Sequence, residues 1–138
     1  MHSAVQKDIE VNASASKVWR LFTDPLLSRE MGGTYDSDWN TGSSISWVDT
    51  SGAIQFRGVI LHLEPEQFLQ HSVIDETGAI SSVITYNVHE VYGSTSIHVR
   101  ENFMNPIDDA SYNNAMARWD LMLKLMKETA EKREPQAL

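Results

Sequence analysis

The sequence contains no cysteine among its 138 residues. This absence excludes a disulfide framework, thiolate metal sites and a cysteine nucleophile. Basic residues are also few, because 11 Lys and Arg stand against 19 Asp and Glu, which gives a formal net charge of -8. Partners rich in phosphate are held mainly by Lys and Arg, so this balance argues against nucleic acid or an anionic membrane surface as the partner.

Long apolar segments are absent as well. No stretch approaches the roughly 20 apolar residues that cross a bilayer, and residues 1–8 lack the apolar region of a secretory signal. We therefore expect a cytoplasmic protein without a membrane span. Because single domains commonly contain about 100–150 residues, the length predicts one domain over residues 1–138, with residues 133–138 as a frayed tail.

The first third of the chain mixes two hydrophobic periods. Apolar and polar residues alternate over residues 4–12, which predicts a strand with one buried face. A helix is expected to begin at Ser14 or Ser16 and to end before Pro25, and a second short helix is expected over residues 25–31. Residues 32–44, rich in Gly, Ser, Asp and Asn, predict a loop.

Five further segments alternate with a period of two, and short turn-forming stretches separate them. They are residues 43–48, 54–64, 68–74, 82–91 and 95–103. Such short connections join antiparallel strands. A long helix with an apolar stripe follows, capped by Asp108, Asp109 or Ser111. The order predicts an α+β fold in which a curved six-stranded antiparallel sheet wraps around the C-terminal helix, with two short helices between strands 1 and 2 and space for a cavity.

Six stretches in this order resemble one known family. They are residues 11–19, 23–25, 37–43, 58–65, 93–95 and 117–119. The chain resembles the homologues of the activator of 90-kDa heat shock protein ATPase, in the START-like (SRPBCC) superfamily that also holds polyketide cyclases and the major birch-pollen allergen. This resemblance implies the helix-grip fold, a cavity for hydrophobic small molecules and, in the founding members, contact with a chaperone. Met31 stands where such sequences often have tryptophan.

Polar residues interrupt the apolar faces of several predicted strands. Strand parity places Arg57 on the same face as Leu61 and Leu63, and it places His71 between Leu69 and Val73. The candidate ligand-binding residues on this interior are Trp47, Arg57, His71, Tyr86, Glu101, Trp119 and Met122.

Each polar candidate has a structural alternative. Arg57 could bind a ligand carboxylate or phosphate, or it could form a structural ion pair with Glu101. A bulge in residues 54–64 would instead turn Arg57 outward. His71 could donate to a ligand carbonyl or could be a satisfied core residue.

The predicted function is binding of a small hydrophobic or amphipathic ligand, such as a lipid, sterol or polyketide-like molecule, without a metal or organic cofactor. One alternative is a stress-response module that contacts a chaperone. Another is a cyclase or hydrolase with a His71–Glu101 acid/base couple, although no catalytic residue is assigned. His62, His89 and His98 share the opposite sheet face and could approach one another, but no carboxylate spacing supports a zinc or nickel site there. We expect a monomer or weak dimer.

Overall fold

The computed structural model describes residues 1–132, so the tail expected at residues 133–138 lies outside the described part of the chain. Seven antiparallel strands form one sheet in the order β1-β7-β6-β5-β4-β3-β2. The strands are β1 (His2–Val11), β2 (Gly33–Ser37), β3 (Ser44–Asp49), β4 (Ile54–Glu64), β5 (Phe68–Ile74), β6 (Ile80–Val91) and β7 (Ser94–Ile107). The helices are α1 (Ala15–Thr23), α2 (Pro25–Ser28), the short 3₁₀ turn η1 (Arg29–Met31) and α3 (Asp109–Glu131).

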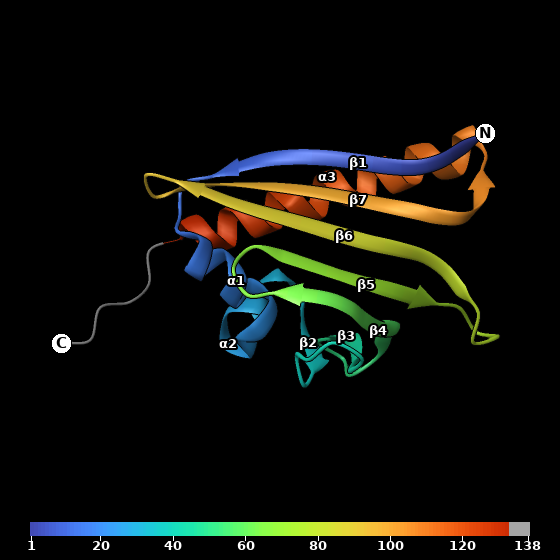
Figure 1. Cartoon of the computed structure of the whole chain (residues 1–138), viewed down its shortest axis with the longest axis horizontal. Helices are drawn as coiled ribbons and strands as arrows, with labels where there is room; N and C mark the ends of the chain where they lie inside the picture. Colours follow the sequence, from blue (N-terminus) through green and yellow to red (C-terminus); the bar gives the residue numbers. More distant parts are fainter. Residues whose placement is uncertain (133–138) are drawn as a thin grey trace.

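The long helix α3 lies along the sheet on the side of β1 and β7, and the sheet curves away from it toward β2, β3 and β4 (Figure 1). Helices α1 and α2 lie beside one end of α3, near β2 (Figure 1). Lys7 of β1 contacts α3 directly, because its ammonium group lies 2.9 Å from the Asp120 carboxylate. The predicted α+β helix-grip architecture is confirmed.

Side-chain caps begin the helices where the sequence predicts them. The Ser14 hydroxyl accepts a hydrogen bond from the Lys17 amide at 3.1 Å at the start of α1. Asp108 accepts one from the Ser111 amide at 2.8 Å at the start of α3. Such caps satisfy amide groups that have no partner within the helix, and they therefore fix where each helix begins.

One strand was missed by the sequence prediction, which assigned residues 32–44 to a loop. Residues 33–37 form β2 and pair with β3, so the sheet has seven strands and not six. The polar composition of residues 32–44 favoured a loop, although Tyr35 in this segment is buried. Tyr35 packs against Trp47 with their ring centroids 4.7 Å apart. Gly33 permits this close pairing, because a Cβ atom there would lie 2.4 Å from the Val48 carbonyl oxygen.

Strand β7 also continues further than predicted, through Pro106 to Ile107. Pairing between β6 and β7 stops at Phe103, whereas His2 of β1 still pairs with Ile107. Residues 104–107 are therefore bordered by a strand on one side only. A proline, which has no amide proton to donate, is tolerated at such an edge.

Strand β4 carries a bulge that corrects one prediction. Ile60 pairs with His71 but His62 pairs with Gln70, so Leu61 is an extra residue opposite β5. A bulge reverses the parity of the residues that precede it. Ile60 is therefore buried, and Arg57 is exposed on the outer side, contrary to the inward placement predicted by counting back from Leu63.

Candidate ligand cavity

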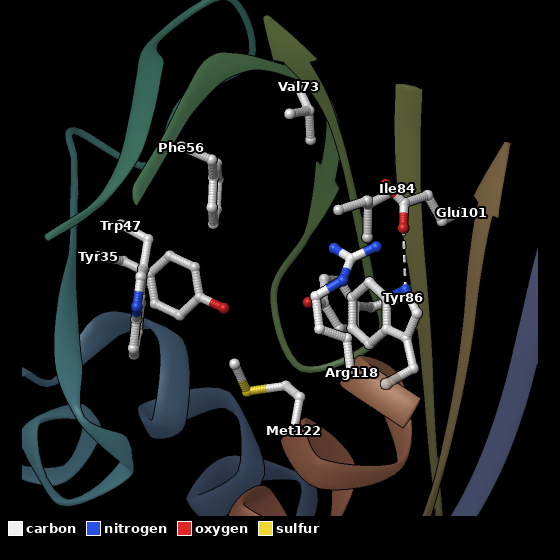
Figure 2. A pocket seen from close by; sticks show the side chains of 10 residues that line it. Tyr35, Trp47, Phe56, Val73, Ile84, Tyr86, Glu101, Arg118 and Met122 are labelled. Carbon is white, nitrogen blue, oxygen red and sulfur yellow. Dashed lines mark hydrogen bonds between the residues drawn. The ribbon is translucent and has the colours of Figure 1, made fainter. Parts of the chain in front are cut away.

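A cavity of about 170 Å³, partly open to solvent, lies between the sheet and α3. Strands β2 to β7 and α3 all contribute to its walls (Figure 2). Its lining residues are Tyr35, Trp47, Phe56, Val73, Ile84, Tyr86, Glu101, Arg118, Trp119 and Met122. The cavity exists because the sheet curves away from α3, so the side chains of its outer strands do not reach the helix.

Half of the lining residues are aromatic. Tyr35, Trp47 and Phe56 come from the far strands, and Tyr86 and Trp119 form the side nearer α3, where their ring centroids are 5.9 Å apart. The Tyr35–Trp47 and Tyr86–Trp119 pairs meet edge to face, the arrangement that the ring quadrupole favours. Flat, rigid walls of this kind suit a planar apolar molecule.

Glu101 is the acidic group of the cavity, and only 6% of its surface is exposed. Its Oε2 accepts a hydrogen bond from the Ser82 hydroxyl at 2.6 Å. Its Oε1 accepts one from the Trp119 indole at 3.0 Å, which is the dashed line at Glu101 in Figure 2. A carboxylate has about four lone-pair positions, so these two donors leave acceptor capacity. Glu101 can therefore accept a further hydrogen bond from a molecule in the cavity.

The basic group of the cavity is Arg118, on α3 one residue before Trp119. Its guanidinium lies on the same side of the cavity as the Glu101 carboxylate (Figure 2). Among residues 1–132 no ion pair joins Arg118 to Glu101 within 4.0 Å. A donor and an acceptor thus lie near each other without satisfying each other directly.

Two tyrosines add hydroxyl groups to the wall of the cavity. The Tyr35 hydroxyl points into the cavity (Figure 2). Burial raises the pKa of Tyr35 to about 12 and raises the pKa of Tyr86 well above its ordinary value, because a phenolate would lose its hydration. Both groups are therefore neutral at physiological pH and can donate or accept a hydrogen bond.

His71 is buried behind the cavity wall. Its ring stacks on Phe56, with ring centroids 5.3 Å apart, and its Nδ1 donates to the Ser72 carbonyl at 2.9 Å. Its Nε2 is buried and has no hydrogen-bond partner among the described residues. Burial lowers the pKa of His71, while the Ser72 carbonyl and the Glu101 charge act in the opposite direction.

The structure brings together most of the residues that the sequence singled out. Trp47, Tyr86, Glu101, Trp119 and Met122 line the cavity, whereas His71 lies behind Phe56 and Arg57 points away. Arg57 does not pair with Glu101, and it borders a different hollow beside residues 74–76. That the cavity residues bind a ligand stays a prediction.

Sequence reasoning left several lining residues out of the predicted site. Tyr35 lay in a segment assigned to a loop, and the bulge at Leu61 moved Phe56 to the inner face. Arg118 could have been predicted from the sequence, because it precedes Met122 by four residues and so lies on the same helix face. Val73 and Ile84 were placed on the inner face but were not assigned to the site.

The histidines on the outer sheet face do not form a metal site. Within residues 1–132 no group of three or more His, Cys, Asp or Glu side chains is arranged to hold a metal ion. His98 pairs with Asp8, and the His62 ring lies 3.6 Å from the Glu64 carboxylate. The acid/base couple considered for catalysis is not in contact either, since His71 and Glu101 share no hydrogen bond.

The curved sheet, the long helix and the cavity between them define a START-like helix-grip protein. A family model described as activator of Hsp90 ATPase homolog 1-like protein matches residues 12–131. The chain belongs to this family. No curated protein matches the chain.

Solved structures agree with this fold. A protein from Mesorhizobium loti, MLL2253, shares 18% identity with a TM-score of 0.78, covering 96% of this chain and 99% of the other. The Aha1 dimer from Colwellia psychrerythraea shares 17% identity with a TM-score of 0.74, over 93% and 96% of the two chains. A protein from Cytophaga hutchinsonii shares 24% identity with a TM-score of 0.75, over 95% and 97%.

Among residues 1–132, no helix has the length and apolar character needed to cross a membrane.

Proposed function

We propose that this protein binds a small, flat, uncharged molecule in the cavity between the sheet and α3. The observation that carries the proposal is Glu101, a buried carboxylate with spare acceptor capacity in a largely apolar wall. Burying a charge in apolar surroundings is costly unless it is hydrogen-bonded. A bound molecule that donates to Glu101 would complete the hydrogen bonding of this carboxylate.

The cavity volume limits the size of the molecule. An apolar cavity of about 150 Å³ holds one benzene ring, whereas pockets for drug-sized ligands measure about 300–1,000 Å³. At about 170 Å³ the cavity suits one aromatic ring with a short polar substituent. A sterol or a multi-ring polyketide, both considered from the sequence, would not be enclosed.

The two charged side chains of the cavity restrict the class of ligand further. An anionic ligand would gain the attraction of Arg118 but would lie beside the Glu101 carboxylate. A neutral amide avoids this conflict, because its carbonyl can accept from Arg118 while its N–H donates to Glu101. Benzamide is therefore the probe that the cavity should prefer, and benzoate is the matched anionic control.

The test is an NMR titration of the labelled protein with benzamide, benzoate and cholesterol. We expect saturable shifts at cavity residues with benzamide, weaker binding of benzoate and no enclosure of the sterol. Val73→Phe fills the cavity and should remove benzamide binding, whereas the same substitution at Val91, which is 52% exposed, should leave it intact. Shifts that persist in Val73→Phe, or that fall outside the cavity, would overturn the proposal.

A second candidate is activation of a chaperone ATPase, which the description of the matching family favours. This function would use an outer surface, and it would not depend on the cavity. An ATPase assay with Hsp90 should then show stimulation that Val73→Phe leaves unchanged. Stimulation that is absent in the wild-type protein would remove this candidate.

A further inference from the structure

A second hollow adjoins the cavity at its charged end. It measures about 490 Å³, is open to solvent, and lies beside the β5–β6 turn and the last residues of β7. Its apolar lining comes from Val73, Ile80, Phe103 and Ile107. We refer to it as the outer groove.

The cavity and the outer groove share three lining side chains. Val73, Glu101 and Arg118 line both of them. The shared carboxylate and guanidinium thus stand at the junction of two apolar compartments. Neither charge has the other as a direct partner, and Glu101 retains capacity for a further donor.

The outer groove exposes apolar surface. Ile80 begins β6 and is 45% exposed, and Phe103 is only partly buried, although both lie beside this hollow. Covering such surface is favourable by the hydrophobic effect. A flexible hydrocarbon chain that leaves the cavity past Arg118 would cover this surface.

The charges of the groove argue against a chain that ends in an anion. Asp75 also borders the groove, and the Thr77 hydroxyl and amide hold its pKa below the ordinary range, so that it stays ionised. Asp75 and Glu101 together carry more negative charge than Arg118 carries positive charge. The chain that fits is an uncharged hydrocarbon.

From these observations we propose that the ligand has two apolar parts joined by a neutral amide, with an aromatic ring in the cavity, the amide between Glu101 and Arg118, and an alkyl chain in the outer groove. This proposal rests on the proposed function, since it extends the same bound molecule. It adds the polar linkage and the chain as the features that the protein recognises.

The experiment compares benzamide with N-hexylbenzamide by isothermal titration calorimetry. We expect the hexyl compound to bind about tenfold tighter or better, because each buried methylene strengthens binding. Ile80→Asp places a charge in the groove and should abolish this gain while leaving benzamide affinity unchanged. Ile54→Asp is the matched control, because Ile54 also begins a strand and is 50% exposed, but it lies outside the groove. The gain should persist in this control.

The linkage is tested with heptylbenzene, which has a ring and a chain but no amide. It should bind more weakly than N-hexylbenzamide to the wild-type protein, and Arg118→Met should reduce this preference. If N-hexylbenzamide binds no tighter than benzamide, or if its tighter binding persists in Ile80→Asp, the two-part ligand is overturned. Benzamide binding would in either case still support the proposed function. Failure of benzamide and N-hexylbenzamide alike to bind would overturn both proposals.

Discussion

The indole nitrogen of Trp119 donates a hydrogen bond to Oε1 of Glu101 at 3.0 Å, which ties α3 to β7 at the centre of the cavity wall. Glu101 lies in a row of inward-facing residues across the sheet, paired with Val5 on one side and Ile84 on the other. The remaining carboxylate oxygen is held by Ser82, two residue pairs along the same two strands. A single charged side chain therefore links helix, sheet and cavity.

Trp119→Phe should lower the free energy of unfolding by about 1–3 kcal/mol, because it removes one of the two donors to a buried carboxylate. Urea denaturation measures this change. Trp39→Phe is the matched control, since Trp39 is only partly buried and its indole nitrogen makes no hydrogen bond to the described residues. In a Glu101→Gln background, Trp119→Phe should cause a smaller loss in the free energy of unfolding. Equal losses in the two backgrounds would contradict an energetic coupling between Trp119 and Glu101.

Gly58→Ala should be strongly destabilising. Strands β4 and β5 approach so closely there that a Cβ atom would lie 1.8 Å from the Ser72 carbonyl oxygen, and backbone atoms cannot move aside cheaply. Gly78→Ala provides the comparison, because its site is open and only its positive φ of 87° opposes a side chain. We expect a loss of about 1 kcal/mol at Gly78 and a clearly larger one at Gly58, both measured by thermal or urea unfolding. A smaller loss at Gly58 would show that the strands can separate.

Stability should fall as the pH drops below about 6.5, in part because of His71. Burial lowers the pKa of His71 in the folded state below its ordinary value of 6.5, against the opposing influence of Ser72 and Glu101. Below that pH the unfolded chain binds a proton that the folded chain does not, so protonation favours unfolding. Above that pH both states are neutral and the contribution is fully present.

Urea unfolding at pH 7.5 and pH 5.5 tests this effect. His71→Phe should reduce the loss of stability between the two pH values, and it should also remove a buried acceptor that has no partner. His89→Phe is the matched control, because it makes the same substitution at an exposed histidine. An unchanged pH dependence in His71→Phe would contradict the assignment.

Arg118→Ala should weaken benzamide binding about fivefold, whereas Arg57→Ala should leave it unchanged. Only Arg118 lines the cavity, and loss of a partly exposed hydrogen bond from a charged donor corresponds to about 1 kcal/mol. Both arginines are exposed, so neither change should unfold the protein. Equal losses for the two variants would mean that the effect arises from net charge and not from contact.

Local sequence patterns predicted most of the fold. The caps at Ser14 and Asp108 depend only on neighbouring residues, and each is one of the alternative positions that the sequence offered. The alternation in β5, β6 and β7 correctly placed His71, Tyr86 and Glu101 on the inner face. Strand β2 was missed because its apolar signal rests on Tyr35, whose burial depends on Trp47 in the neighbouring strand.

The sequence by itself therefore determined the order of the elements other than β2, the family and the inner faces of the regular strands, because these depend on periodicity and on contiguous residues. Only the tertiary structure decided which arginine lies at the cavity and how large the cavity is. One extra residue at Leu61 turns Arg57 outward and Phe56 inward, and the sheet's curvature leaves the cavity that Arg118 of α3 and Glu101 both line. A bulge and a curvature are relations between strands, and no single strand's pattern contains them.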